Sequence, residues 1–246
     1  MQVNRTLAAK PGKPAQIASW MHLAGFLAIM AVLLALGLYQ QHAGGGSGAG
    51  ARQLASHAYA IPIYLTALGM DWLLLFYCWA GVRRHGGKLW DLAGGRWKNW
   101  RDVLTDFAIV LPFWAVWEGA AYCVHLLLGS GSGKTVDSLL PKSLVEVLVW
   151  IATCVTAGIC EEMAFRGYLQ RQFHALTGSV AWAIVLQALV FGIAHGYQGW
   201  RNVVVIIVLG VLYGALAAWR KNLRANMISH AWADVWEGWL KFVVFR

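Results

Sequence analysis

Long apolar stretches separated by short polar segments run through most of the chain. Each stretch is close to the roughly 20 residues that an α-helix needs to cross a bilayer. On this pattern we predict spans at residues 20–39, 60–82, 108–128, 144–165, 180–194, 203–219 and 225–244. The chain is therefore expected to be all-α, a polytopic membrane helix bundle with about seven transmembrane helices.

Composition and charge agree with this expectation. Hydrophobic residues make up 59% of the chain and charged residues only 13%, which is far from the balance of a soluble domain. The net charge of +9 comes from Lys and Arg residues that lie between the apolar stretches, so membrane topology explains it better than nucleic acid binding. By the positive-inside bias we expect a cytoplasmic N-terminus, and the absence of an organellar targeting segment favours a bacterial inner membrane.

Two glycine-rich segments carry no predicted chemistry. Residues 43–51 are expected to be a flexible connection on the outer side. Residues 129–135 read GSGSGKT, but Leu128 stands where a phosphate-binding loop needs its first glycine, and no strand precedes the segment. We therefore expect no nucleotide site there.

Ionisable side chains inside the apolar stretches are the candidate functional residues, because each is costly at membrane depth unless it is paired or lines a polar cavity. Glu161 and Glu162 are adjacent, and Arg166 follows Glu162 by four residues. An α-helix places Glu162 and Arg166 on one face, where they can form an ion pair. Glu161 then lies about 100° further round the helix, free to act as a general base.

Two further polar positions follow in the next apolar stretches. His195 comes four residues after Phe191, whose ring is expected to shield it from lipid, and His230 precedes Asp234 by four residues. An Asp bound to one ring nitrogen of His230 would decide which tautomer the other nitrogen presents. Taken singly, each of these groups could be structural, since a lone His is usually a packing residue. Three marked helices in succession favour a joint site.

Two other intramembrane carboxylates have weaker support. Asp71 and Glu118 lie in predicted spans, but neither has a His or an Arg at helical spacing. Of the two, Asp71 is worth testing by substitution.

The ordered motifs EExxxR, FxxxH and HxxxD resemble the CPBP (Abi) family of intramembrane proteases, which includes the type II CAAX prenyl endopeptidases. The resemblance implies a catalytic helix bundle over residues 144–246 and an N-terminal transmembrane region of variable type over residues 1–143. By the same resemblance, Glu161 would activate water with the help of His195. Glu162 and Arg166 would form the structural pair of the first motif.

The resemblance also assigns His230 and Asp234 to stabilising the oxyanion of a tetrahedral intermediate. The prenyl endopeptidases usually have Asn at the last position, and an ionised Asp cannot donate to an oxyanion. Asp234 is therefore expected to orient His230 or to stay protonated. The favoured mechanism needs no cofactor. A divalent metal such as zinc is the alternative, with Glu161, His195 and His230 as ligands.

These inferences together predict an intramembrane endopeptidase that acts on a membrane-associated peptide or protein within the lipid bilayer, with no nucleic acid partner. One alternative is a non-proteolytic membrane immunity or scaffold protein of the same family. Another is a transporter that uses the carboxylates as a proton relay, although the chain has no inverted repeat.

The depths of the candidate residues leave one difficulty. At 1.5 Å per residue, Glu161 and His195 can meet, whereas His230 lies only roughly 9 Å into its predicted span. Either the loop of residues 220–224 dips inward, or the last helix boundary differs from the prediction.

Overall fold

The computed structural model describes residues 14–44, 59–129 and 140–244. Within these residues the chain is helical apart from turns and short connections, and it contains no β-strand. Most of the glycine-rich residues 43–51 and nearly all of GSGSGKT lie outside the described residues. The main helices are α1 (Trp20–Gly44), α3 (Ala60–Arg84), α5 (Trp100–Leu128), α7 (Leu144–Glu161), α8 (Gln170–Thr177), α9 (Val180–Ala194), α10 (Trp200–Arg220) and α11 (Arg224–Val244).

The predicted membrane bundle is confirmed. Among the described residues, five helices are long and apolar enough to cross a membrane: Trp20–Tyr39, Ala60–Arg84, Trp100–Leu128, Leu144–Thr177 and Trp200–Arg220. Helix α9 has the predicted bounds but only 15 residues, and α11 is not among the candidate spans. Charged residues such as Asp234 and Glu237 interrupt the apolar sequence of α11.

Two boundaries differ by more than a few residues from those predicted. Helix α5 begins at Trp100, eight residues before the predicted start at residue 108, because the Asn99 side chain caps it by accepting a hydrogen bond from the Asp102 amide. The fourth span continues to Thr177 as one unbroken helix instead of ending at residue 165. The added turns are amphipathic, so hydropathy alone does not find them.

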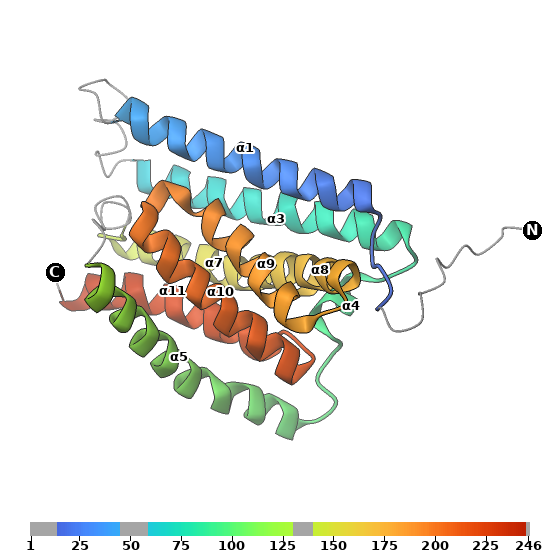
Figure 1. Ribbon diagram of the computed structural model, residues 1–246. Coiled ribbons are helices and arrows are strands. Elements are labelled where there is room, and N and C mark those ends of the chain that lie inside the picture. Colours follow the sequence, from blue (N-terminus) through green and yellow to red (C-terminus); the bar gives the residue numbers. More distant parts are fainter. Residues whose placement is uncertain (1–13, 45–58, 130–139, 245–246) are drawn as a thin grey trace, which may run out of the picture.

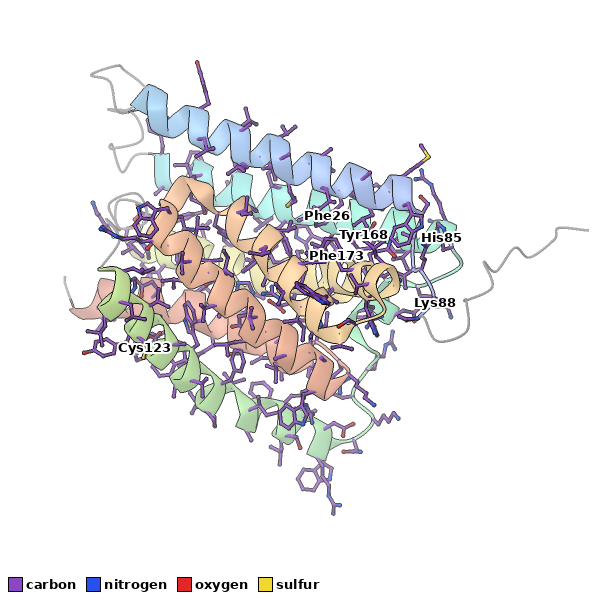
Figure 2. All side chains as sticks on the ribbon, in the orientation of Figure 1. Phe26, His85, Lys88, Cys123, Tyr168 and Phe173 are labelled. Atoms are coloured by element: carbon purple, nitrogen blue, oxygen red, sulfur yellow. The ribbon has the colours of Figure 1, made fainter. Side chains whose placement is uncertain are left out.

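The central helix of the bundle consists of α7, the π-helical segment η2 (Glu162–Leu169) and α8. Helices α1 and α3 lie on one side of it, α5 lies on the opposite side, and α9, α10 and α11 lie between (Figure 1). Every residue of η2 is buried. Phe26 of α1 packs against Tyr168 of η2, and both lie near Phe173 in the interior (Figure 2). The first candidate motif therefore lies in the best-packed part of the fold.

The turn between α10 and α11 lies beside the middle of the central helix. A Cβ atom on Gly167 would lie 2.8 Å from the carbonyl oxygen of Leu92 and 3.2 Å from a methyl carbon of Leu223, so only glycine permits this approach. Leu92 belongs to the short helix α4 (Leu89–Ala93), and the Leu223 amide donates to the Ala93 carbonyl at 2.9 Å. The turn therefore packs beside η2 and not beside the C-terminal end of α8. This position resolves the depth difficulty, because His230 follows Leu223 by about two helical turns.

A buried carboxylate holds this turn in place. The Asp106 side chain is fully buried in α5, where it accepts hydrogen bonds from Arg220 Nη2 at 2.8 Å, Arg224 Nε at 2.9 Å and Trp97 Nε1 at 2.8 Å. One side chain of α5 therefore joins the end of α10 to the start of α11. Removing the charge would leave two guanidinium groups without their partner.

We expect Asp106→Asn to lower the free energy of unfolding by about 3 kcal/mol, near the lower end for breaking a buried ion pair because both arginines keep some solvent contact. Unfolding of the purified protein in detergent measures the change. Asp102→Asn is the matched control, since its side chain accepts the Lys98 amide near the surface. Equal stability of the two variants would contradict the role of Asp106.

Candidate active site

The Glu162 carboxylate is at the centre of the candidate site. Arg166 Nη1 donates to Glu162 Oε1 at 2.8 Å, and both side chains are fully buried. This pair was predicted from the spacing of the two residues. Two more donors complete the environment, because His230 Nδ1 lies 2.9 Å from Oε1 and Asn226 Nδ2 donates to Oε2 at 3.1 Å. Glu162 is thus fully engaged and is not available as a base.

Arg166 is further held by two aromatic rings. Its guanidinium carbon lies 4.3 Å from the ring centroid of Phe191 and 5.2 Å from that of Tyr213. Such cation–π contacts help to compensate a charge that has lost its water. Phe191 also packs edge-on against the rings of His195, at 4.9 Å, and His230, at 6.3 Å. The phenylalanine of the second motif therefore lies between the structural arginine and both histidines.

The His230 ring is oriented from one side by Glu162. Because a carboxylate only accepts, the 2.9 Å contact places a proton on Nδ1. The other nitrogen, Nε2, faces Glu161 Oε2 at 3.8 Å and Asp234 Oδ2 at 3.6 Å. Both distances exceed a direct hydrogen bond, so Nε2 has no direct hydrogen-bond partner among the described residues.

This arrangement refines the expected role of Asp234, since Glu162 is the residue that holds His230 Nδ1. Asp234 lies at the opposite nitrogen, one helical turn after His230 on α11. The exposed fractions are 40% for the Asp234 side chain, 18% for Glu161 and 0% for Glu162. The site therefore has a closed side at Glu162 and an open side at Asp234 and Glu161.

His195 stands at the C-terminal end of α9. Its Nδ1 donates to the Phe191 carbonyl oxygen at 2.8 Å, because a carbonyl only accepts. In the neutral ring Nε2 is therefore an acceptor. His195 lies close enough to Asp234 for the two side chains to interact electrostatically.

Helix α3 runs parallel to the central helix and brings a further carboxylate to the site. Near the start of both helices, the ring centroids of Tyr64 and Trp150 are 5.2 Å apart. Further along, Tyr77 and Tyr168 both contact His22 of α1, the first by ring stacking at 4.1 Å and the second through a 2.7 Å hydrogen bond. The two contacts align α3 with α7 and η2 in the same direction.

Asp71 lies midway between the two aligned positions on α3, which is the level of Glu161 on the central helix. Its carboxylate interacts electrostatically with Glu161, His230 and Asp234, and Cys160 is influenced by both Asp71 and Glu161. Sequence reasoning gave Asp71 little weight because it has no partner on its own helix. Its partners belong to α7 and α11, a relation that helical spacing cannot reveal.

Asn226 is a second site residue that sequence reasoning missed. It is fully buried, and its Nδ2 donates to the Tyr213 carbonyl oxygen at 2.8 Å as well as to Glu162. The signal for it was available, because Asn226 lies four residues before His230 and thus on the same face of α11.

The proposed metal ligands do not form a suitable set in this arrangement. Within the described residues, no three His, Cys, Asp or Glu side chains are grouped so that they could hold a metal ion. Of the three candidates, Glu161 and His230 approach each other, and His195, whose Nδ1 is bound to a backbone carbonyl, could act as a ligand only through Nε2. We therefore derive no step through a metal.

Comparison with known families supports the grouping of these motifs. Residues 143–236 match the family model described as type II CAAX prenyl endopeptidase Rce1-like. These residues, less than half of the chain, are similar to this family, and we call them the Rce1-like domain. The resemblance to the CPBP family is thereby confirmed for the part of the chain that carries all three motifs. No curated protein and no solved structure matches the chain. Asp71 and Asp106 lie outside the Rce1-like domain.

The adjacent glutamates provide a test of the closed and open sides of the site. We expect Glu162→Gln to lower the free energy of unfolding by about 3 kcal/mol or more, because it leaves the Arg166 guanidinium buried without a counter-charge. Glu161→Gln should change the unfolding free energy little, since the ion-pair partner recorded for Glu161 in the described part of the chain, His230 Nε2, is 3.8 Å away. Unfolding of both variants in the same detergent is the measurement, and equal destabilisation would contradict the assignment.

Proposed function

We propose that the protein is an intramembrane endopeptidase that hydrolyses a peptide bond of a membrane-associated substrate. The observation that carries the proposal is the environment of His230, whose Nδ1 is fixed by Glu162 while Nε2 faces Glu161 at 3.8 Å and Asp234 at 3.6 Å. A proposed general base, Glu161, therefore lies beside a ring nitrogen that is free to donate. The match to the Rce1-like family supports proteolysis as the reaction.

Glu161 is the proposed general base. It takes a proton from water as the water oxygen attacks the carbonyl carbon of the scissile peptide bond. The carbonyl oxygen becomes an oxyanion, and collapse of the tetrahedral intermediate breaks the bond between carbon and nitrogen. The proton held by Glu161 passes to the departing nitrogen, so the products are a carboxylic acid and an amine. Glu161 returns to its starting form.

His230 and His195 have complementary roles in this reaction. When His230 carries a proton on both nitrogens, Nε2 donates to the oxyanion while Glu162 keeps the ring in place. Asp234 then supports the charged ring instead of contacting the oxyanion itself. His195, with Nδ1 bound to the Phe191 carbonyl oxygen, offers Nε2 as an acceptor that orients the attacking water.

The name of the matching family suggests a prenylated C-terminal peptide as the first substrate class to examine. The Asp at position 234 differs from the Asn that is usual in the prenyl endopeptidases, so the C-terminal tails of membrane helices form a second class. Both classes present a peptide bond close to the bilayer. The open side of the site, at Asp234 and Glu161, is the side from which the bond would enter.

The cytoplasmic side of the protein is proposed to be the end that carries α4 and the turn between α10 and α11. Helices α3 and α7 run parallel, and basic residues gather where both approach this end, among them Arg83, Arg84, Lys88, Arg171 and Lys221. By the positive-inside bias this end faces the cytoplasm, with the N-terminus on the same side. A bacterial inner membrane remains the proposed location.

Cleavage of fluorogenic prenylated CAAX peptides and model membrane-helix tails by the purified protein tests the mechanism. We expect Glu161→Gln to lower kcat/KM by roughly 10²–10⁴-fold, the range for loss of a general base. His195→Ala should give a smaller loss. Cleavage should persist with a chelator present. Full activity of a folded Glu161→Gln variant would exclude Glu161 as the base.

Other outcomes of the same assay separate the alternatives. Chelator-sensitive cleavage would replace the proposed mechanism by a metal-dependent one. Absence of cleavage across the panel, by protein shown to be folded, would favour an immunity or scaffold protein. Activity that depends on a proton gradient would favour transport.

Asp71 is proposed to position the charges around His230 without contacting the reacting atoms. We expect Asp71→Asn to lower kcat/KM by about tenfold, which equals about 1.4 kcal/mol of lost charge interaction, and to shift the pH profile of kcat. Asp71→Glu should restore part of the activity because it restores an ionisable carboxyl group. Glu118→Gln on α5 is the matched control. An unchanged pH profile in active Asp71→Asn would show that the residue is only structural.

A further inference from the structure

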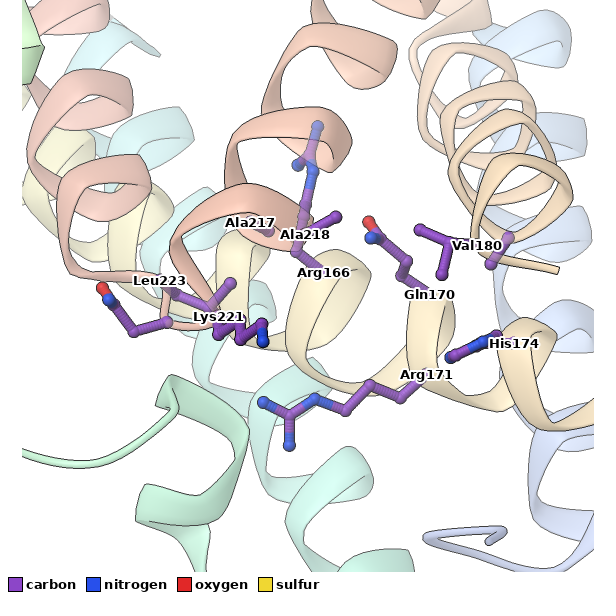
Figure 3. A pocket seen from close by; sticks show the side chains of 11 residues that line it. Arg166, Gln170, Arg171, His174, Val180, Ala217, Ala218, Lys221 and Leu223 are labelled. Carbon is purple, nitrogen blue, oxygen red and sulfur yellow. The ribbon is translucent and has the colours of Figure 1, made fainter. Parts of the chain in front are cut away.

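A cavity of about 300 Å³ lies at the proposed cytoplasmic end, beside Arg166 and the turns of the central helix that follow it (Figure 3). Helix α8, the start of α9, the end of α10 and the turn that leads into α11 surround it. Its polar lining consists of Arg166, Gln170, Arg171, His174, Lys221 and Asn222. Small apolar side chains of α9 and α10 complete the wall.

The lining is rich in positive charge. Three cationic side chains and one histidine line the cavity, and its lining includes no Asp or Glu. Part of the charge is already balanced, since Arg166 is paired with Glu162 and Arg171 donates to the carbonyl oxygens of Asp91 and Leu92. The Asp91 carboxylate also acts on Arg171 from outside the cavity. Lys221 is exposed and has no such carboxylate beside it among the described residues, so the cavity keeps a positive field.

Two buried side chains of the lining hold polar atoms without a partner. Arg166, 2% exposed, has no hydrogen-bond partner among the described residues for Nε and Nη2. Gln170, 8% exposed, uses its Nε2 to donate to the Gly214 carbonyl oxygen at 3.1 Å, but its Oε1 has no partner in the same part of the chain. Buried polar atoms are normally satisfied, so these donors and this acceptor indicate a ligand.

We propose that this cavity binds a phosphate group, carried either by an anionic phospholipid headgroup or by free inorganic phosphate. Arginine and lysine side chains are the groups that proteins use most for phosphate oxygens. A hydroxyl of a phosphate monoester or of a glycerol headgroup would suit Gln170 Oε1. The cavity does not serve the reaction at Glu161, and the proposal stands apart from the proposed proteolysis.

The rim of the cavity explains how a lipid would reach it. Val180 is 44% exposed and Trp219 is 69% exposed beside the cavity residues of α9 and α10. Apolar side chains at this level suit acyl chains, and a tryptophan suits the interface between headgroups and hydrocarbon. The basic end of the protein lies where anionic headgroups are attracted.

The first test measures binding by native mass spectrometry of the protein in neutral detergent. The probes are short-chain phosphatidic acid, phosphatidylglycerol and phosphatidylcholine, and inorganic phosphate is measured separately by thermal shift. We expect one anionic lipid to be retained in preference to phosphatidylcholine. Lys221→Asn should weaken this binding about tenfold, because it removes a charged donor. Lys221 has a φ of 54°, a conformation that Asn tolerates well, so the backbone should be preserved.

Lys98→Asn is the matched control. It removes one lysine from the same end of the protein, but Lys98 does not line the cavity. His174→Gln supplies an independent change of the lining. We expect Lys221→Asn and His174→Gln to weaken lipid binding, and Lys98→Asn to leave it unchanged. Size-exclusion profiles verify that all three variants are folded.

The source of the phosphate follows from the two arms of the experiment. Retention of the anionic lipid without a thermal shift in inorganic phosphate would assign the cavity to a headgroup. A thermal shift with inorganic phosphate that is lost in Lys221→Asn would assign it to free phosphate. The proposal is overturned if the wild-type protein binds neither probe, or if Lys98→Asn weakens binding as much as Lys221→Asn does.

Discussion

A single buried carboxylate, that of Glu162, determines the geometry of the site. Arg166, His230 and Asn226 all donate to it, so the central helix, α11 and the structural arginine meet at one pair of oxygen atoms. A carboxylate without water is stable only if its lone pairs are satisfied in this way. The catalytic arrangement is consequently fixed by the same interactions that compensate the buried charge.

The two adjacent glutamates illustrate how one helix can give different environments, and so different chemistry, to two side chains of the same type. Glu162 faces the interior, where its donors hold it, whereas Glu161 faces the open side towards Nε2 of His230. The change to π-helical winding begins at Glu162. Wider turns of this kind are frequent at functional sites, and here the winding changes between the proposed general base, Glu161, and the residue that orients His230.

The sequence predicted most of the fold because membrane helices are defined by local composition. The span at residues 180–194 and the pair of Glu162 with Arg166 both follow from apolar length and helical spacing. The long continuation of the fourth span was missed because its last turns are amphipathic. Asp71 was undervalued because its neighbours come from other helices, and no periodicity along one segment records which helices pack together.

The depth of His230 was also unpredictable for a physical reason. Hydropathy measures where a span becomes polar, but the turn before α11 is placed by Gly167, which allows Leu223 to approach the central helix. Glycine has no side chain, so hydropathy does not show that Gly167 permits a close contact. The position of the third motif therefore depends on a packing contact that only the folded chain displays.

Asp106 makes the Rce1-like domain depend on a helix outside it. It lies on α5, outside the Rce1-like domain, yet it binds the two arginines that flank the turn into α11. Asp71, on α3, likewise brings an ionisable carboxyl group to the site from outside that domain. Exchange of the amino-terminal helices between relatives must therefore carry these two carboxylates with it. An exchange of these helices would therefore be limited by two side chains, Asp71 and Asp106.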